Sequence, residues 1–202
     1  YTPLELEGRD LYIREGCNAC HSQMIRPFRD EVVRFNGKNG QYSTAGAFIY
    51  DRPFLWGSKR TGPDLHRQGG KNPSSWHFKH MYNPRSTSAG SIMPRYPWLI
   101  ANELDRSQTQ DKLLLMKNVF DVPYTKAQID SVDSWADNQA SKIVKDMFTE
   151  AGDVKKQFDD EKAAKGANFI PLEKREITAL MAYLQRLGTD IKTTEVTTAS
   201  NN

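Results

Sequence analysis

The chain has 202 residues, of which 38% are hydrophobic and 26% charged, and its formal net charge is only +3. This length suffices for one domain with a substantial core or for a small domain that carries large insertions, and we favour the second interpretation. Basic and acidic residues are interleaved, no signal peptide is recognisable and no apolar run approaches the roughly 20 residues of a membrane-spanning helix, so we expect neither a nucleic-acid partner nor a membrane span in this chain.

The first predicted element is an amphipathic helix that begins after Thr2 and runs to about Glu15. Thr2 can cap this helix, and Pro3 suits its first position. Glu5 completes a capping box with Thr2. Gly8 lies between the apolar positions of the helix and would allow a second helix to approach closely.

The next segment, Cys17-Asn18-Ala19-Cys20-His21, contains the only two cysteines of the chain. Two thiols separated by two residues and followed directly by a histidine are the attachment signature of a c-type haem. The spacing suits this chemistry because the thiols add across the two vinyl groups of one porphyrin while the histidine reaches the iron. One covalent haem c is therefore predicted, held by Cys17 and Cys20, with His21 as an iron ligand.

Two other interpretations of this cysteine pair fit less well. A thioredoxin-like dithiol should follow a buried strand in a βαβ pattern, whereas residues 11–16 have the pattern of a helix end. A structural zinc site usually takes four ligands, and without a second cysteine pair two of His66, His77 and His80 would have to supply the others. His77 and His80 lie three apart on one predicted helical face, but such histidines are more often solvated or packed than metal-bound.

Residues 22–60 are rich in aromatic residues, glycine and arginine, and we expect short strands near residues 31–35 and 47–50. Turn signals lie at Asn36-Gly37 and Asn39-Gly40. The aromatic side chains supply enough apolar surface to wrap a flat cofactor, although packing an inserted hairpin is their commoner use.

The remainder of the chain is predominantly helical in pattern. A rigid turn at residues 61–65 precedes a short helix predicted over about Ser74–Tyr82. Residues 173–187 form a strong amphipathic helix that Gly188 closes. Residues 189–202 lack apolar content and are expected to be disordered. In the charged stretch between the helices predicted at 74–82 and 173–187, further helices are predicted at 111–120, 126–151 and 154–165.

Six methionines compete to be the second iron ligand opposite His21. Met24 is too close to His21 in sequence to cross the haem easily, and Met81 on the short helix is a weak rival. Met93 lies on a loop that Pro94 restrains, which is a suitable mount for an axial ligand. We therefore expect Met93 to be the sixth ligand. The methionines on predicted amphipathic helices, where this residue usually fills core, are Met116, Met147 and Met181.

The order of these motifs resembles that of a class I cytochrome c. More closely, several segments resemble the mono-haem cytochrome c subunit of cbb-type cytochrome c oxidases, the C-family haem-copper oxygen reductases. Because these segments are distributed along the chain, the likeness spans nearly its whole length. They are residues 13–17, 21–29, 56–65, 91–94, 122–125 and 182–189.

The resemblance implies an all-α, class I cytochrome c-like domain around one covalent haem c, over residues 1–188. Insertions are expected at about 28–60, as a loop and short-strand segment, and at 101–168, as extra helices before the C-terminal helix. The family's subunit normally begins with a transmembrane helix that this chain lacks. The segment at residues 153–168 is also longer and more charged than the corresponding part of the family pattern, which puts the surface that contacts a partner there in doubt.

The resemblance also implies roles for individual residues. Cys17 and Cys20 would hold the haem, and His21 and Met93 would ligate its iron. The Pro63 carbonyl would accept the second ring N–H of His21, which would fix the tautomer of that histidine and raise its basicity. The candidates for pairing with the haem propionates are Arg60, Arg85 and Arg95.

As function, the resemblance implies an electron-transfer subunit that is not catalytic on its own. It would take electrons from a di-haem or other cytochrome c donor and pass them to the catalytic haem-copper oxidase subunit. Its place would be the periplasmic side of a bacterial inner membrane, with a membrane anchor absent from this chain. His/Met ligation suits this role because it raises the potential and leaves no open iron position.

Two alternatives to this function stay open at this stage. A free soluble class I cytochrome c shuttle shares every ligand with the oxidase subunit, and a haem peroxidase-type enzyme requires an exchangeable sixth iron site. The chain begins at Tyr1 without an initiator methionine. We therefore expect a processed or truncated product, which leaves room for an upstream anchor or export signal.

Overall fold

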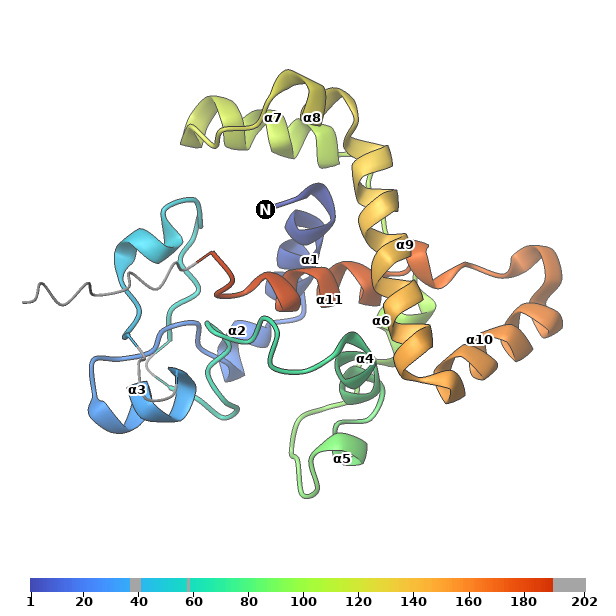
Figure 1. The fold of residues 1–202 in the computed structure, drawn as a ribbon, viewed down its shortest axis with the longest axis horizontal. Coiled ribbons are helices and arrows are strands. Elements are labelled where there is room, and N and C mark those ends of the chain that lie inside the picture. Colours follow the sequence, from blue (N-terminus) through green and yellow to red (C-terminus); the bar gives the residue numbers. More distant parts are fainter. Residues whose placement is uncertain (37–40, 58, 191–202) are drawn as a thin grey trace, which may run out of the picture.

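The fold is all-α, as the sequence predicts. The computed structural model describes residues 1–36, 41–57 and 59–190, and within these residues it contains helices and no strand (Figure 1). The turn signals at residues 37 and 39–40 and most of the predicted disordered tail, residues 191–202, lie outside the described residues. Within the described residues, no helix combines the length and the apolar character that crossing a membrane requires.

The centre of the molecule is the crossing of the first and last helices, α1 (Pro3–Arg14) and α11 (Glu176–Arg186) (Figure 1). The predicted capping box at Thr2 and Glu5 is present. The predicted close approach at Gly8 is also confirmed, because a Cβ atom there would lie 2.0 Å from the Ala179 carbonyl oxygen. The glycine thus lets the two backbones meet, and both helices bury most of their residues.

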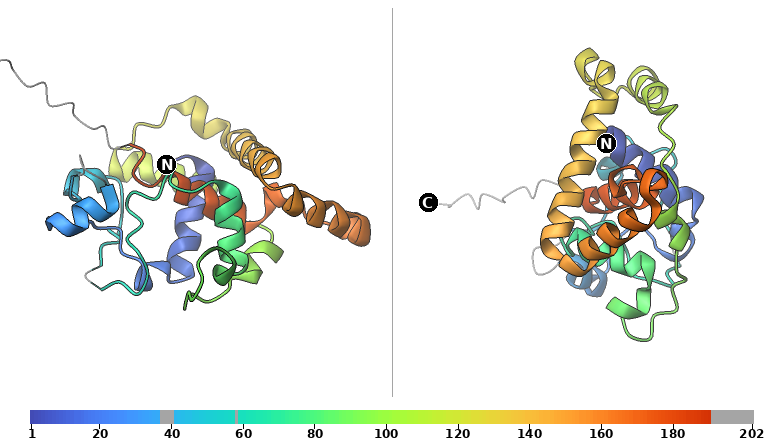
Figure 2. Two further views of the ribbon diagram at one scale, coloured as in Figure 1. Left: turned by 60° about the horizontal axis from the view of Figure 1, so that its bottom comes forward. Right: turned by 90° about the vertical axis from the view of Figure 1, so that its right-hand side faces the viewer.

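A long helix, α9 (Val132–Glu150), packs against α1, α11 and the short helix α4 (Ser74–Tyr82) (Figure 2). Its buried residues recur every three or four positions, as a single apolar face of an α-helix requires. The C-terminal part of this face joins the largest hydrophobic cluster, and the rest of the face packs into two smaller clusters. The buried residues of α9 are Val132, Ala136, Ala140, Val144 and Met147.

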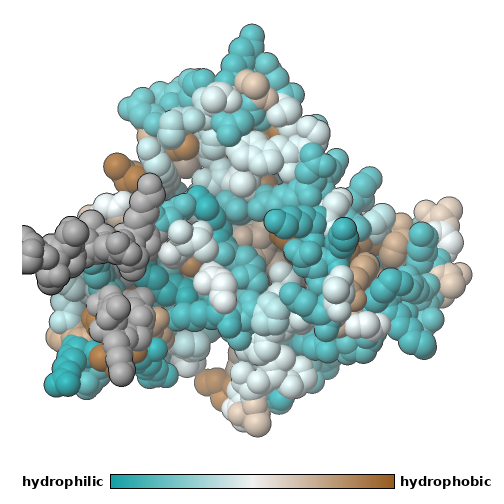
Figure 3. All heavy atoms as spheres, viewed as in Figure 1, coloured by the Kyte–Doolittle hydropathy of each residue, from teal (hydrophilic) through white to brown (hydrophobic). Residues whose placement is uncertain are grey.

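Further helices surround this centre. The predicted helices at 111–120 and 154–165 correspond to α7 (Thr109–Phe120) and α10 (Gly152–Lys165). The helix predicted over 126–151 is divided into α8 (Lys126–Asp130) and α9, because Ser131 leaves helical geometry and its hydroxyl donates to the Ala127 carbonyl. On the face shown in Figure 3, hydrophilic residues predominate and the hydrophobic ones lie in small separate groups.

The C-terminal helix begins later than predicted. Residues Leu172–Lys174 form a 3₁₀ turn, and Arg175 is extended before α11 starts. The Arg175 guanidinium is 3% exposed, donates to the carbonyls of Ile170 and Ile100 and pairs with Glu161. These tertiary contacts favour the extended conformation of Arg175 over another helical turn.

The two strands predicted in residues 28–60 were wrong. Residues 31–35 belong to α3 (Arg29–Asn36), and residues 45–48 form a 3₁₀ turn. In α3 the acidic residues Asp30 and Glu31 lie in the first turn, where the helix dipole favours them. Glu31 also pairs with Arg60, so a charge contact with a residue outside α3 stabilises the helix. The β-branched Val32 and Val33 suggested a strand, but no neighbouring strand is present among the described residues.

Candidate functional site

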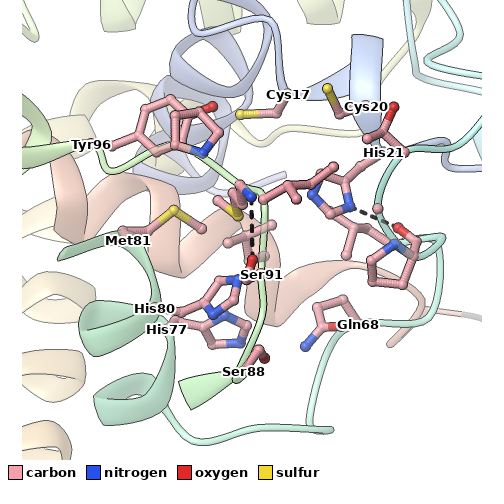
Figure 4. Close-up of a pocket in the computed structure, with 18 of the residues that line it drawn as sticks. Cys17, Cys20, His21, Gln68, His77, His80, Met81, Ser88, Ser91 and Tyr96 are labelled. Carbon is pink, nitrogen blue, oxygen red and sulfur yellow. Dashed lines mark hydrogen bonds between the residues drawn. The ribbon is translucent and has the colours of Figure 1, made fainter. Parts of the chain in front are cut away.

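A cavity of about 490 Å³ lies beside the central helix crossing (Figure 4). It is lined by the cysteine segment, the turn at residues 61–65, α4, the loop at residues 88–96 and one face of α11. Its walls include apolar side chains such as Leu65, Leu180 and Leu184. A concave, largely apolar space of this size suits a cofactor-sized ligand.

The two cysteines lie together at one end of this cavity (Figure 4). They sit on a single helical turn, α2 (Cys17–Cys20), which begins after Gly16 in the left-handed conformation at φ 68°. Both thiols are free, Cys17 partly buried and Cys20 exposed. Burial raises the pKa of the Cys17 thiol to about 12, whereas a reactive dithiol needs a lowered pKa.

The zinc interpretation also lacks support in the structure. In residues 1–36, 41–57 and 59–190, no group of three or more His, Cys, Asp or Glu side chains is arranged to hold a metal ion. His66 lies away from the cavity, whereas His77 and His80 line it.

His21 is held so that one ring nitrogen is available to the cavity. Its Nδ1 atom lies 2.8 Å from the Pro63 carbonyl oxygen. Because a carbonyl can only accept, Nδ1 carries the proton and Nε2 keeps its lone pair. Burial lowers the pKa of His21, which favours this neutral form. Neutral imidazole with a free Nε2 is the form that ligates a metal.

The turn that carries Pro63 is fixed by a buried carboxylate, Asp64. Asp64 is 3% exposed and accepts from the Ser22 hydroxyl at 2.5 Å, the Met24 N–H at 2.8 Å and the His66 N–H at 2.9 Å. The N–H groups of residues 61 and 62 both donate to the Cys20 carbonyl. These contacts join the turn to the segment after His21, so they set the position of the Pro63 carbonyl.

Two methionines line the cavity, Met81 from α4 and Met93 from the loop at residues 88–96. Met81 is buried, and Met93 is partly buried with its N–H donating to the Ser91 hydroxyl. The structure thus reduces six candidate ligands to two. The methionines that do not line the cavity are Met24, Met116, Met147 and Met181.

The description of the matching family is cytochrome c oxidase, mono-haem subunit/FixO, and its model covers residues 1–191. The chain belongs to the FixO family. This agrees with the resemblance in the sequence and makes the chain a haem-binding cytochrome c subunit of a membrane-associated oxidase complex that includes a catalytic subunit. No match was found among curated proteins.

In this FixO family chain, the arginines expected at the haem propionates do not line the cavity. Arg60 donates to the Ser22 hydroxyl and the Met24 carbonyl, and it pairs with Glu31 and Asp64. Arg95 donates to a backbone carbonyl at 3.0 Å and is exposed. Arg85 is also exposed. Arg60 therefore stabilises the turn that positions Pro63 instead of reaching into the cavity.

Sequence reasoning missed two polar residues of the FixO cavity, Gln68 and His77. Both are buried and line the cavity (Figure 4). Among the residues that the structure describes, neither Gln68 Nε2 nor His77 Nε2 has a hydrogen-bond partner. The sequence carries no signal for Gln68, whereas His77 was singled out only as a weak metal candidate. Unpartnered donors, apolar walls, paired thiols and a histidine with a free nitrogen together fit a haem.

Proposed function

We propose that this chain holds one haem c covalently and relays single electrons within a cbb-type cytochrome c oxidase. Cys17 and Cys20 would form the thioether links, and His21 and Met93 would be the axial ligands. The donor would be a di-haem or other cytochrome c, and the acceptor would be the catalytic haem-copper subunit. We further propose that residues 1–188 act as one domain on the periplasmic side of a bacterial inner membrane.

The observation that carries this proposal is the convergence of three groups on one cavity. The two free thiols and the unprotonated Nε2 of His21 come from the segment at residues 17–21, the methionine thioether comes from a part of the chain at least 60 residues later, and all of them line the same space. Family membership supports the same cofactor and places the chain in an oxidase complex.

Each of these residues has a definable task. The Pro63 carbonyl accepts a hydrogen bond from the Nδ1–H of His21 and so keeps Nε2 aimed at the cavity. Leu180 and Leu184 contribute an apolar wall that excludes water. Met93 would fill the second axial position, which removes the open site that oxygen or peroxide chemistry needs. The haem, when bound, supplies reversible one-electron exchange at its iron.

The proposal is tested by producing the chain together with a cytochrome c maturation system. An alkaline pyridine spectrum should show one c-type haem per chain, and the double variant Cys17→Ser/Cys20→Ser should retain none after denaturation. Ser88→Ala, which alters the cavity wall without touching a thiol, serves as the matched control and should keep its haem. A wild-type chain without covalent haem would overturn the proposal.

The relay itself is tested in the assembled complex. Loss of the haem through Cys17→Ser/Cys20→Ser should abolish electron flow from reduced cytochrome c, while carbon monoxide binding at the catalytic subunit persists. Rapid oxygen consumption by the isolated chain would instead favour the peroxidase-type alternative. Full activity of a complex that lacks this chain would favour the free shuttle.

A further inference from the structure

Two buried side-chain nitrogens at one end of the cavity make no hydrogen bond to the described residues. Gln68 is 9% exposed and His77 is 2% exposed, and within the described residues neither side-chain Nε2 atom makes a hydrogen bond. Leaving a buried donor unsatisfied costs about 1–3 kcal/mol, so native proteins almost always provide an acceptor. These two nitrogens therefore indicate an acceptor that the described part of the chain does not supply.

Both donors are rigidly mounted. The loop that carries Gln68 is tied to the C-terminal helix end, because the Gly69 N–H donates to the Leu187 carbonyl at 2.8 Å. A Cβ atom at Gly69 would lie 2.4 Å from the Gln185 carbonyl oxygen, so this loop can lie so close only with glycine there. His77 lies on α4, with its ring edge-on to Trp76 at 5.3 Å. Fixed donors of this kind form a preorganised site.

The donors lie at the far end of the cavity from the cysteines. Figure 4 shows Cys17 and Cys20 at one end, and Gln68, His77 and Ser88 at the other. A haem tied through its vinyl positions to the cysteines carries two propionate carboxylates on the edge away from those vinyl groups. The propionate carboxylates accept hydrogen bonds, and they would lie at the same end of the cavity as the unpartnered nitrogens of Gln68 and His77.

The charge of the site is also informative. Among the described residues that line the cavity, none is Asp, Glu, Lys or Arg. Burial lowers the pKa of His77, and in the neutral Nε2–H tautomer the ring nitrogen Nε2 is a hydrogen-bond donor. The nearby His80 already contacts the Thr87 hydroxyl through Nδ1. Arg60 and Arg95, the cations expected here, are occupied elsewhere.

We propose that Gln68 and His77 bind the haem propionates through side-chain hydrogen bonds, in place of the arginine ion pairs that the sequence suggested. This inference rests on the proposed haem. Its consequence is electrostatic: a carboxylate that is hydrogen-bonded without an arginine partner keeps more of its negative charge, and each hydrogen-bond donor offsets part of that charge. Deleting a donor therefore stabilises the ferric state and lowers the reduction potential.

The experiment uses the haem-loaded full chain in four variants. Gln68→Met and His77→Phe delete a donor, His77→Asn keeps an N–H, and His66→Gln alters a buried histidine that does not line the cavity. Spectroelectrochemistry gives the midpoint potential. Redox-difference infrared spectra, with the propionate carboxyls labelled with carbon-13 through 5-aminolevulinate, report hydrogen bonding to those groups.

The two deletions should each reduce the equilibrium constant for reduction by up to about tenfold, which corresponds to about 59 mV for one electron. They should also shift the labelled carboxylate bands. His77→Asn should recover most of the loss, and His66→Gln should match the wild type. The inference would be overturned if the deletion variants kept their haem but left both the reduction potential and the labelled carboxylate bands unchanged. Bound water would then be the hydrogen-bond partner of the two nitrogens.

Failure of the proposed function has a different signature, because a wild-type chain without covalent haem would give no labelled bands at all. If His77→Phe does not fold, Gln68→Met decides the question. Gln68→Glu provides a second check, since a carboxylate facing the propionates should lower the potential more than Gln68→Met. A potential equal to that of Gln68→Met would count against direct contact.

Discussion

The His21 imidazole lies directly over the backbone of Gly62, and its Nδ1–H donates to the carbonyl of the next residue, Pro63. A Cβ atom at Gly62 would lie 2.2 Å from Cε1 of the ring and 2.7 Å from Nδ1. The glycine is therefore required by the close approach of a side chain. The same short turn supplies both the space for the ring and the carbonyl that orients it.

This contact predicts the result of Gly62→Ala. The added methyl group must displace the ring, which breaks the hydrogen bond to Pro63 and moves Nε2. We expect haem incorporation to fall severalfold and the free energy of unfolding to fall by about 1–3 kcal/mol. Pyridine spectra and chemical denaturation measure the two effects. Gly46→Ala is the control, because nothing lies within 4 Å of a Cβ there, and equal effects of both variants would contradict the prediction.

The choice between the two cavity methionines is decided by substitution. Met93→Ala should abolish the methionine-to-iron charge-transfer band of the oxidised protein and lower its potential. Met81→Ala should keep the band, although truncating this buried residue costs about 2–5 kcal/mol of stability. Absorption in the near infrared checks both variants. A band that survives in Met93→Ala and disappears in Met81→Ala would transfer the ligand role to Met81.

The buried carboxylate of Asp64 should be important for stability. Asp64→Ala leaves the Ser22 hydroxyl and two backbone N–H groups without an acceptor, and it removes a partner of Arg60. We expect the free energy of unfolding to fall by about 3–5 kcal/mol in urea denaturation. Asp160→Ala, which removes an exposed pair with Lys156, should cost less than about 1 kcal/mol. Similar losses in the two variants would show that Asp64 is not a structural anchor.

His66 should make the stability depend on pH. Burial and the charge of Arg67 lower its pKa to about 3, and its ring stacks on Phe48 at 4.2 Å. An unfolded histidine titrates near about 6.5, so below that pH the unfolded chain binds more protons than the folded one. The contribution of neutral His66 to the free energy of unfolding is therefore fully present above pH 6.5 and is lost as the pH falls toward 3.

Between pH 7 and pH 5 this single group should reduce the free energy of unfolding by about 2 kcal/mol. Urea denaturation of the wild type and of His66→Gln at both pH values isolates the effect, because the other titrating groups are common to both. The variant should lose less stability than the wild type on acidification. Parallel losses in the two proteins would show that His66 does not carry this dependence.

The local chemistry of the helices was readable from the sequence. The capping box at Thr2 and Glu5 and the boundaries of α4 were predicted correctly because they depend on neighbours within one or two turns. The strands predicted near residues 31–35 and 47–50 were wrong for the opposite reason. There, an ion pair from Glu31 to the distant Arg60 and the absence of a partner strand in the described residues decided the conformation.

The candidate site likewise has features that could be predicted from the sequence and features that depend on tertiary contacts. The sequence by itself determined the haem motif at Cys17, Cys20 and His21, because thiol spacing and the adjacent histidine are fixed by covalent geometry along the chain. Only the tertiary structure decided that Met81 and Met93 share the cavity and that Arg60 pairs with the carboxylates of Glu31 and Asp64. It also decided that the Nε2 atoms of Gln68 and His77 lie at the far end of the cavity with no hydrogen-bond partner among the described residues. These are contacts between segments distant along the chain, and packing of α4 and α11 against the rest of the molecule fixes them.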